Sequence, residues 1–181
     1  LRQKYPGITS GESCLLINGA LVPSNALHEA IISLSSGQAL SKDGKILAAN
    51  VDSLASLEEL NELLAIEFTE PIALLERNWH IFKGAGEQIR ADFELITKNR
   101  DSERITDPYT KLYNKQNIFI EEGVNIKAAT LDADNGPIYL GKNSTIEAGA
   151  IIKGPFGLGE GSTINGQAHM RGDISIGPHC K

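Results

Sequence analysis

An apolar residue recurs at every sixth position through the second half of the chain. The series has seven members: Leu140, Ile146, Ile152, Leu158, Ile164, Met170 and Ile176. Four places after each member comes a mostly small residue: Ser144, Ala150, Phe156, Ser162, Ala168, Ile174 and Cys180. Neither the 3.6-residue period of an α-helix nor the two-residue period of an open strand gives this spacing. A six-residue period predicts short strands joined by turns, each strand being one side of a coil in a parallel β-helix.

A longer period sets the size of one coil. Gly141, Gly159 and Gly177 each follow an apolar residue and lie eighteen positions apart. Three hexads therefore make one coil, and the three glycines are expected to stack in one column. The repeat is expected to begin at residues 118–120. The step from Ile126 to Leu140 is two residues longer than a multiple of six, which predicts a small insertion around residues 132–136.

The first half of the chain, residues 1–99, is predicted to be a mixed α/β segment. An apolar run at residues 14–19 predicts a buried strand, and Ser24 begins a predicted helix. Asp43-Gly44 predicts a tight hairpin, because a type I′ turn needs positive φ at both central residues. Further predictions are a helix from Ser56 through Leu64, a strand at residues 71–75 and a helix at residues 86–99. Trp79 is predicted to be a core residue.

Residues 100–117 are polar and are predicted to be a linker, which leaves residues 118–181 for the β-helix. The repeat stops at Lys181 with no capping segment after it, although solenoids normally cover their last coil. This pattern predicts that the chain is a piece of a longer protein.

Overall composition narrows the class of function. The formal net charge of −6 argues against a nucleic-acid-binding surface or a polybasic membrane surface. No apolar run approaches the roughly 20 residues that a membrane span requires. Cys14 and Cys180 lack metal-ligand spacing and are predicted to be reduced thiols, so the expected location is the cytoplasm.

Several short runs of the sequence are typical of one protein family. The runs are residues 15–19 (Leu-Leu-Ile-Asn-Gly), 43–44 (Asp-Gly), 78–82 (Asn-Trp-His-Ile-Phe), 92–96 (Asp-Phe-Glu-Leu-Ile), 136–141 (Gly-Pro-Ile-Tyr-Leu-Gly) and 176–180 (Ile-Gly-Pro-His-Cys). With these runs the chain resembles bacterial sugar-1-phosphate nucleotidyltransferases that carry a C-terminal left-handed β-helix. The resemblance is to a divergent branch of the N-acetylglucosamine-1-phosphate uridyltransferases and glucose-1-phosphate thymidylyltransferases. The resemblance, and not the spacing, implies left-handed coils. It also implies transfer of a nucleotidyl group from a nucleoside triphosphate to a sugar-1-phosphate, with Mg²⁺ as cofactor.

Two departures from the family pattern bear on activity. Nothing in the chain matches the family's glycine-rich loop that cradles the triphosphate. The family's strand ends Asn-Gly-Asp, with the Asp on Mg²⁺, whereas Ala20 follows Asn18-Gly19 here. We therefore expect the 181-residue chain alone to be inactive. Asn18 and Gly19 remain candidates for binding sugar or nucleotide, and an ordinary turn is the alternative.

Two histidines lie in the repeat, His169 and His179. Hexapeptide acyltransferases use an outward-facing histidine as general base, so these are candidate catalytic residues for acyl transfer from acetyl-coenzyme A. They are ten residues apart and are not expected to act together, and a solvated surface histidine is the alternative for each.

Lys153 and Arg171 lie one coil apart, so their side chains are expected to be neighbours. Two like charges about 5 Å apart repel unless an anion or an acidic partner bridges them. The pair is therefore a candidate anion site or inter-subunit ion pair, with a solvated pair as the alternative.

The resemblance also implies a homotrimer, packed through one face of each β-helix, for the whole protein. The column of Gly141, Gly159 and Gly177 is the expected contact between subunits, because it leaves backbone open to a neighbour. A non-catalytic reading stays open as well, in which the repeat is a trimerisation stalk and the α/β half a binding module.

Overall fold

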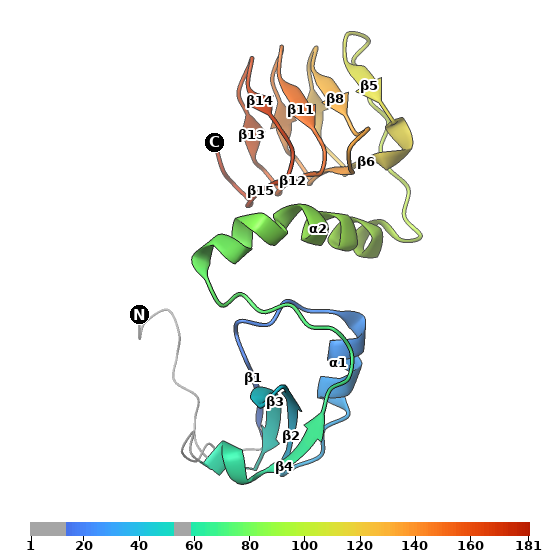
Figure 1. The fold of residues 1–181 in the computed structure, drawn as a ribbon. Helices are drawn as coiled ribbons and strands as arrows, with labels where there is room; N and C mark the ends of the chain where they lie inside the picture. Colours follow the sequence, from blue (N-terminus) through green and yellow to red (C-terminus); the bar gives the residue numbers. More distant parts are fainter. Residues whose placement is uncertain (1–13, 53–58) are drawn as a thin grey trace. The chain divides into compact units, whose positions relative to one another are not determined.

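The computed structural model describes residues 14–52 and 59–181, which form parts of two compact units (Figure 1). Unit 1 spans residues 1–78 and unit 2 spans residues 79–181. Each unit is described separately below. None of the described helices is long and apolar enough to cross a membrane.

Unit 1 contains a four-stranded sheet in the order β1-β3-β2-β4. Strand β3 pairs antiparallel with β1 and β2, and β4 joins β2 in parallel. Asp43 and Gly44 have φ values of 50° and 74°, which confirms the predicted type I′ hairpin. The strands are β1 (Cys14–Ile17), β2 (Gln38–Lys42), β3 (Lys45–Val51) and β4 (Leu64–Glu67).

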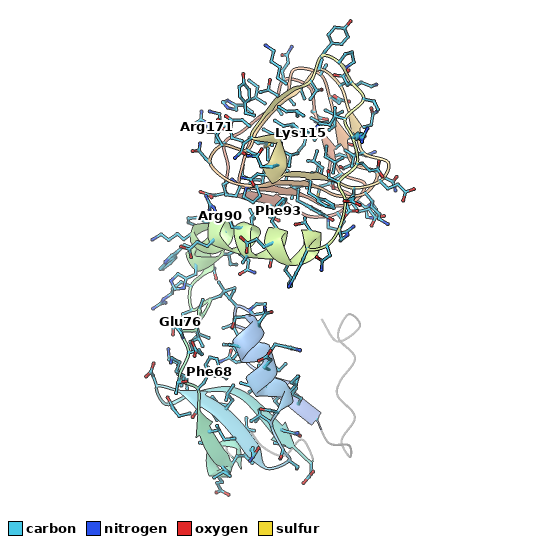
Figure 2. All side chains as sticks on the ribbon, turned by 90° about the vertical axis from the view of Figure 1, so that its right-hand side faces the viewer. Phe68, Glu76, Arg90, Phe93, Lys115 and Arg171 are labelled. Atoms are coloured by element: carbon cyan, nitrogen blue, oxygen red, sulfur yellow. The ribbon has the colours of Figure 1, made fainter. Side chains whose placement is uncertain are left out.

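Helix α1 (Asn25–Ile32) covers one face of this sheet. The Ser24 hydroxyl accepts a hydrogen bond from the Leu27 amide at 3.3 Å and so caps the helix. Leu27 and Ile31, one turn apart, are buried against a core that includes Leu47 and Phe68 (Figure 2). The helix predicted to begin at Ser24 is therefore confirmed.

The prediction of a helix from Ser56 through Leu64 is wrong over the described residues 59–64. A short 3₁₀ helix, η1, occupies Glu59–Glu62, and Leu64 already begins β4. The ladder that Leu64–Glu67 makes with β2 outweighs the local helix signal. Residues 56–58 lie outside the described part of the chain. The strand predicted at residues 71–75 is reduced to a single bridge between Leu21 and Leu74.

Unit 2 contains a parallel β-solenoid of about three turns, consistent with a left-handed β-helix. Each coil gives one short strand to each of three sheets, ordered β13-β10-β7, β14-β11-β8-β5 and β15-β12-β9-β6. Leu140 pairs with Leu158, and Leu158 with Ile176, at the predicted spacing of eighteen. The strands are β5 (Lys111–Tyr113), β6 (Ile118–Ile120), β7 (Asn125–Ile126), β8 (Thr130–Asp132), β9 (Ile138–Leu140), β10 (Thr145–Ile146), β11 (Ile151–Lys153), β12 (Phe156–Leu158), β13 (Thr163–Ile164), β14 (His169–Met170) and β15 (Ile174–Ile176), with a 3₁₀ turn, η2, at Lys115–Asn117.

The predicted inward residues form the core of the solenoid. Five of the seven are at most 3% exposed, whereas Met170 and Ile176 in the last coil are only partly buried. Each fully buried side chain of this size stabilises the fold by roughly 1.5–3 kcal/mol. The hexad pattern therefore identifies this core correctly.

The glycine column has a different role from the predicted contact between subunits. A Cβ built on Gly141 would lie 2.7 Å from the Leu158 carbonyl oxygen, and one built on Gly159 would overlap the backbone at residues 177–178. The missing side chains thus point along the solenoid axis at the next coil. These two glycines let successive coils approach each other, and they do not expose backbone to a neighbouring subunit.

Helix α2 (Asn78–Thr97) lies along the sheet β15-β12-β9-β6 (Figure 1). Its Gly86 abuts the carboxylate of Asp173 in the last coil. An Arg90 guanidinium nitrogen donates to the Asn135 carbonyl oxygen at 2.8 Å. Half-buried Phe93 lies on the side of the helix that faces the solenoid (Figure 2). The helix therefore runs from the last coil at its N-terminus toward the first coil at its C-terminus.

The domain boundaries differ from those predicted. Helix α2 belongs to unit 2, and β5, within the predicted linker of residues 100–117, pairs with β8 as part of the first coil. The segment before β5 caps that coil, since the Glu103 amide donates to the Ile120 carbonyl at 2.8 Å. Trp79 is 49% exposed, so the prediction of a core residue is wrong.

Candidate functional site

The turn that follows β1 is held by Asn18. Its backbone amide donates to the Leu47 carbonyl at 2.9 Å, and its side-chain amide donates to the Ile46 carbonyl at 3.3 Å. Its side-chain oxygen accepts from the Ala20 amide at 3.0 Å, which makes an Asx turn. Within the described residues, the Asn18 side chain is thus engaged in shaping the turn around Gly19.

Gly19 has no evident packing role among the described residues of unit 1. Its φ is not positive, and a Cβ built on it would meet nothing within 4 Å in the described structure. Neither backbone conformation nor packing therefore requires a glycine here. A glycine at an open turn leaves room for a ligand to approach the backbone closely, and an ordinary turn is the alternative.

Two charged side chains that are not among the candidates from the sequence lie beside this turn. The Leu75 amide donates to the Ala20 carbonyl at 2.7 Å, which brings the following residue, Glu76, beside the turn. Glu76 forms a salt bridge with Lys45, and both side chains are about half exposed. The partners are 31 residues apart, and no motif links them. The tertiary pairing brings one cation and one anion to the edge of the turn.

The side chains at this turn do not by themselves fit a Mg²⁺ site. Ala20 offers no side-chain ligand, and the Glu76 carboxylate is already neutralised by Lys45. Across the described residues, no three His, Cys, Asp or Glu side chains come together as a metal-binding group. Mg²⁺ dependence stays a prediction from the resemblance.

A second polar cluster lies where the end of α2 meets the solenoid. Buried Glu121 accepts hydrogen bonds from Tyr139 and from Arg100, each at 2.7 Å. The Arg100 guanidinium also lies 5.1 Å from the centre of the Phe119 ring, which stacks on Tyr139. A small cavity of about 190 Å³ adjoins Glu121 and the segment of residues 103–106.

The titration behaviour of this cluster follows from its geometry. Burial alone would raise the pKa of Glu121, but the hydrogen bonds from Tyr139 and Arg100 and the charge of Arg100 lower it overall. Burial, together with the Glu121 hydrogen bond and charge, raises the pKa of Tyr139 to about 12. The cluster keeps Glu121 charged and Tyr139 neutral at pH 7, which fits a polar contact between α2 and the solenoid.

The two solenoid histidines lie in different settings. His169 is exposed on β14 and pairs with Ile151 in the neighbouring coil. His179 occupies a corner with φ of 57°, and its ring lies against Gly161 of the preceding coil. In the described structure, neither imidazole has a hydrogen-bonded carboxylate. The hypothesis of acyl transfer gains no support from these two side chains.

Lys153 and Arg171 directly follow Ile152 and Met170, which pair with each other in adjacent coils. Asp132 lies opposite Lys153 on the other side and approaches its ammonium group to 3.9 Å. Arg171 projects from the outside of the solenoid (Figure 2). The two cations, Lys153 and Arg171, therefore already have one acidic neighbour, Asp132, on the same side of the solenoid.

Comparison with known proteins identifies the family of the first part of the chain. No curated protein matches the chain. A family model described as sugar nucleotidyl transferase matches residues 1–101, which is more than half of the sequence. The matched range includes the sheet of unit 1, the Asn18-Gly19 turn and helix α2. The chain belongs to the sugar nucleotidyl transferase family.

Proposed function

We propose that the whole protein transfers a nucleotidyl group from a nucleoside triphosphate to a sugar-1-phosphate. The family supports nucleotidyl transfer to a sugar in general. The observation that carries the proposal to specific residues is the open turn at Gly19, whose glycine the described fold does not require. In this proposal the sugar phosphate approaches the Gly19 backbone.

Lys45 is the nearby group suited to an anionic substrate. Its salt bridge with Glu76 is half exposed, so a phosphate can compete for the ammonium group at modest cost. Exchange of the carboxylate for a phosphate would then place the substrate against the turn. Asn18 acts as a positioning residue, because its side chain fixes the turn and not the ligand.

The test separates binding from turnover. The 181-residue chain is titrated with UTP, dTTP and several sugar-1-phosphates while the Gly19 amide is followed by NMR. We expect a sugar-1-phosphate to shift the Gly19 signal, and Gly19→Val and Lys45→Gln each to weaken binding about tenfold. Gly157→Ala in the solenoid is the matched control. An unchanged Gly19 signal with every sugar phosphate contradicts its assignment to this turn.

Pyrophosphate release by the whole protein tests the reaction itself. Sugar-1-phosphates are combined with each triphosphate, in the presence and in the absence of Mg²⁺. Release that depends on both substrates supports nucleotidyl transfer. Silence across UTP and dTTP with several sugars contradicts it.

We propose further that the whole protein is a cytoplasmic homotrimer. Cys14 and Cys180 are both free thiols, which fits a reducing compartment. Helix α2 covers one solenoid face, and the face with β11 leaves Ile151 and Tyr113 exposed for contacts between copies. Light scattering that gives a monomer across micromolar concentrations contradicts the trimer.

A further inference from the structure

The segment in front of the first coil takes a shorter path than the coil beside it. The Glu103 amide donates to the Ile120 carbonyl at 2.8 Å, and the Asp107 carboxylate accepts from the Ala128 amide at 3.0 Å. Between these two contacts the segment has three residues and the coil has seven. The segment is therefore too short to follow the coil, and a cavity of about 190 Å³ lies between them.

Strand β7 faces this cavity with the backbone of Ile126. The Asn125 and Lys127 amides on either side of it donate to carbonyls of the next coil at 2.9 and 3.0 Å. Because the backbone groups of a parallel strand alternate between its two sides, the N–H and C=O of Ile126 point the other way, to the side of the cavity. No described group bonds to them, since β7 pairs with β10 alone. Ile126 is 8% exposed, so a buried donor and a buried acceptor need a partner.

Charged and polar side chains complete the lining of the cavity. Glu121 lines it, and the Arg100 guanidinium neutralises this carboxylate at 2.7 Å. Glu103, Arg104 and Thr106 line it from the segment. With Arg100 included, two carboxylates and two guanidinium groups lie at the cavity. It therefore offers donors and acceptors without an excess of either charge, which favours a neutral ligand over a phosphate.

The size and chemistry of the cavity fit a small polyol. An apolar cavity of about 150 Å³ holds benzene, so this slightly larger one accommodates a six-membered ring with polar substituents. A hydroxyl group can donate to a carbonyl or carboxylate and accept from an amide at the same time. Ile120 and Val124 offer apolar contacts to the C–H groups of the ring.

We infer that this cavity is a binding site for a neutral sugar or a comparable cyclic polyol. The hydroxyl groups bond to the free backbone of Ile126 and to the Glu121 and Glu103 carboxylates, and Arg104 donates from the segment. The site lies within unit 2 and is separate from the Gly19 turn of unit 1. It does not depend on the proposed transfer reaction.

The test follows the Gly123 and Ile126 amides of the 181-residue chain by NMR. The chain is titrated with D-glucose and myo-inositol as neutral polyols, with cyclohexanol as a mainly apolar ring and with glucose-1-phosphate as a charged sugar. We expect glucose or inositol to shift both signals, with saturation in the millimolar range that is usual for so small a ligand. Saturation separates binding from the general effect of an excluded cosolute, which rises steadily with concentration.

Two matched pairs of variants localise the binding. Arg104→Ala and Glu103→Gln should each weaken polyol binding about fivefold, as the loss of one hydrogen bond does. Lys127→Ala and Glu122→Gln, beside the cavity but outside its lining, should leave binding unchanged. All four side chains are exposed, so the fold should tolerate each change.

Four outcomes overturn the proposal. Without a saturable shift from either polyol, water alone fills the cavity. Tighter binding of cyclohexanol or of glucose-1-phosphate contradicts a site for a neutral polyol. Equal losses in the lining and control variants place the ligand elsewhere. Shifts confined to Gly19 overturn this site while they support the proposed function.

Discussion

The Tyr139 hydroxyl donates a hydrogen bond to Glu121 at 2.7 Å, linking two coils at the place where α2 ends. Arg100, just beyond α2, binds the other carboxylate oxygen of Glu121. The Glu121 side chain is only 7% exposed, so a solvent-poor carboxylate joins the helix to the solenoid. The contact is made of charge-assisted hydrogen bonds, which are stronger than neutral ones.

Glu121→Gln should therefore weaken unit 2 in a pH-dependent way. We expect a loss of about 1–3 kcal/mol in the free energy of unfolding at pH 7, because the charged hydrogen bonds are lost. The folded state lowers the pKa of Glu121, so its contribution is present above the unfolded pKa and disappears as the pH falls through the folded value. Urea unfolding should give a constant difference between the two proteins above about pH 5, which shrinks below about pH 4. A difference that is independent of pH would contradict the assignment.

Tyr139 should titrate later than an ordinary tyrosine. Its pKa is raised to about 12, mainly by burial and then by the Glu121 carboxylate. Stability from this neutral phenol is complete below pH 10 and is lost as the pH rises through about 12. The tyrosinate absorbance of the parent minus that of Tyr139→Phe should have its midpoint near the raised value. A midpoint near 10 would show that the Tyr139 hydroxyl is exposed to solvent.

The glycine column gives a matched pair of substitutions. Gly141→Ala should destabilise the solenoid by about 1–3 kcal/mol, because its Cβ would lie 2.7 Å from the Leu158 carbonyl oxygen and rigid backbone cannot yield. Gly157→Ala should be neutral or slightly stabilising, since the nearest atom is the Ser175 hydroxyl at 3.8 Å. Thermal unfolding of both variants measures the contrast. Equal Tm values would show that the coils are not in close contact at Gly141.

Inward and outward positions of one coil should respond oppositely to charge. Ile152 is fully buried, so Ile152→Asp would place an unpaired carboxylate in the core and should unfold the solenoid. Glu160 is exposed, and Glu160→Lys should change the free energy of unfolding by less than about 0.5 kcal/mol. Circular dichroism during heating compares the two. The assignment of faces is refuted by variants of equal stability.

The sequence predicts the solenoid better than the α/β half for a physical reason. The hexad repeat of Leu140 to Ile176 encodes the same local choice seven times, so pattern and tertiary packing agree. The strand at Leu64–Glu67 is stabilised by a ladder with β2, 26 residues away, and a local helix signal hides it. Local pattern also misplaces Trp79, which is 49% exposed although the helical face that carries it is apolar.

Only part of the candidate site can be predicted from the sequence. Asn18-Gly19 can be predicted because a short apolar run ends there and the resemblance marks it. Lys45 and Glu76 cannot, because their pairing depends on the Leu75-to-Ala20 hydrogen bond between distant segments. The Glu121 cluster is hidden for the same reason, since its three polar groups come from the end of α2 and two different coils.

Two serines at the same position of adjacent coils provide the last test. Ser162 donates to the Gly177 carbonyl at 2.8 Å and accepts from the Cys180 amide at 2.9 Å. Ser144 is equally buried, but its hydroxyl has no hydrogen-bond partner among the described residues. Ser162→Ala should cost about 1 kcal/mol of unfolding free energy, because it leaves two backbone groups unpaired.

Ser144→Ala should instead be neutral or stabilising by up to about 1 kcal/mol, because it removes a buried hydroxyl that gains nothing from the fold. Both substitutions remove the same oxygen atom from the same position of a coil, so the difference between them isolates the hydrogen bonds. Urea unfolding of the two variants and their parent measures it. A larger loss for Ser144→Ala than for Ser162→Ala would show that the Ser144 hydroxyl has a partner in solution and that the two coils are held by different contacts.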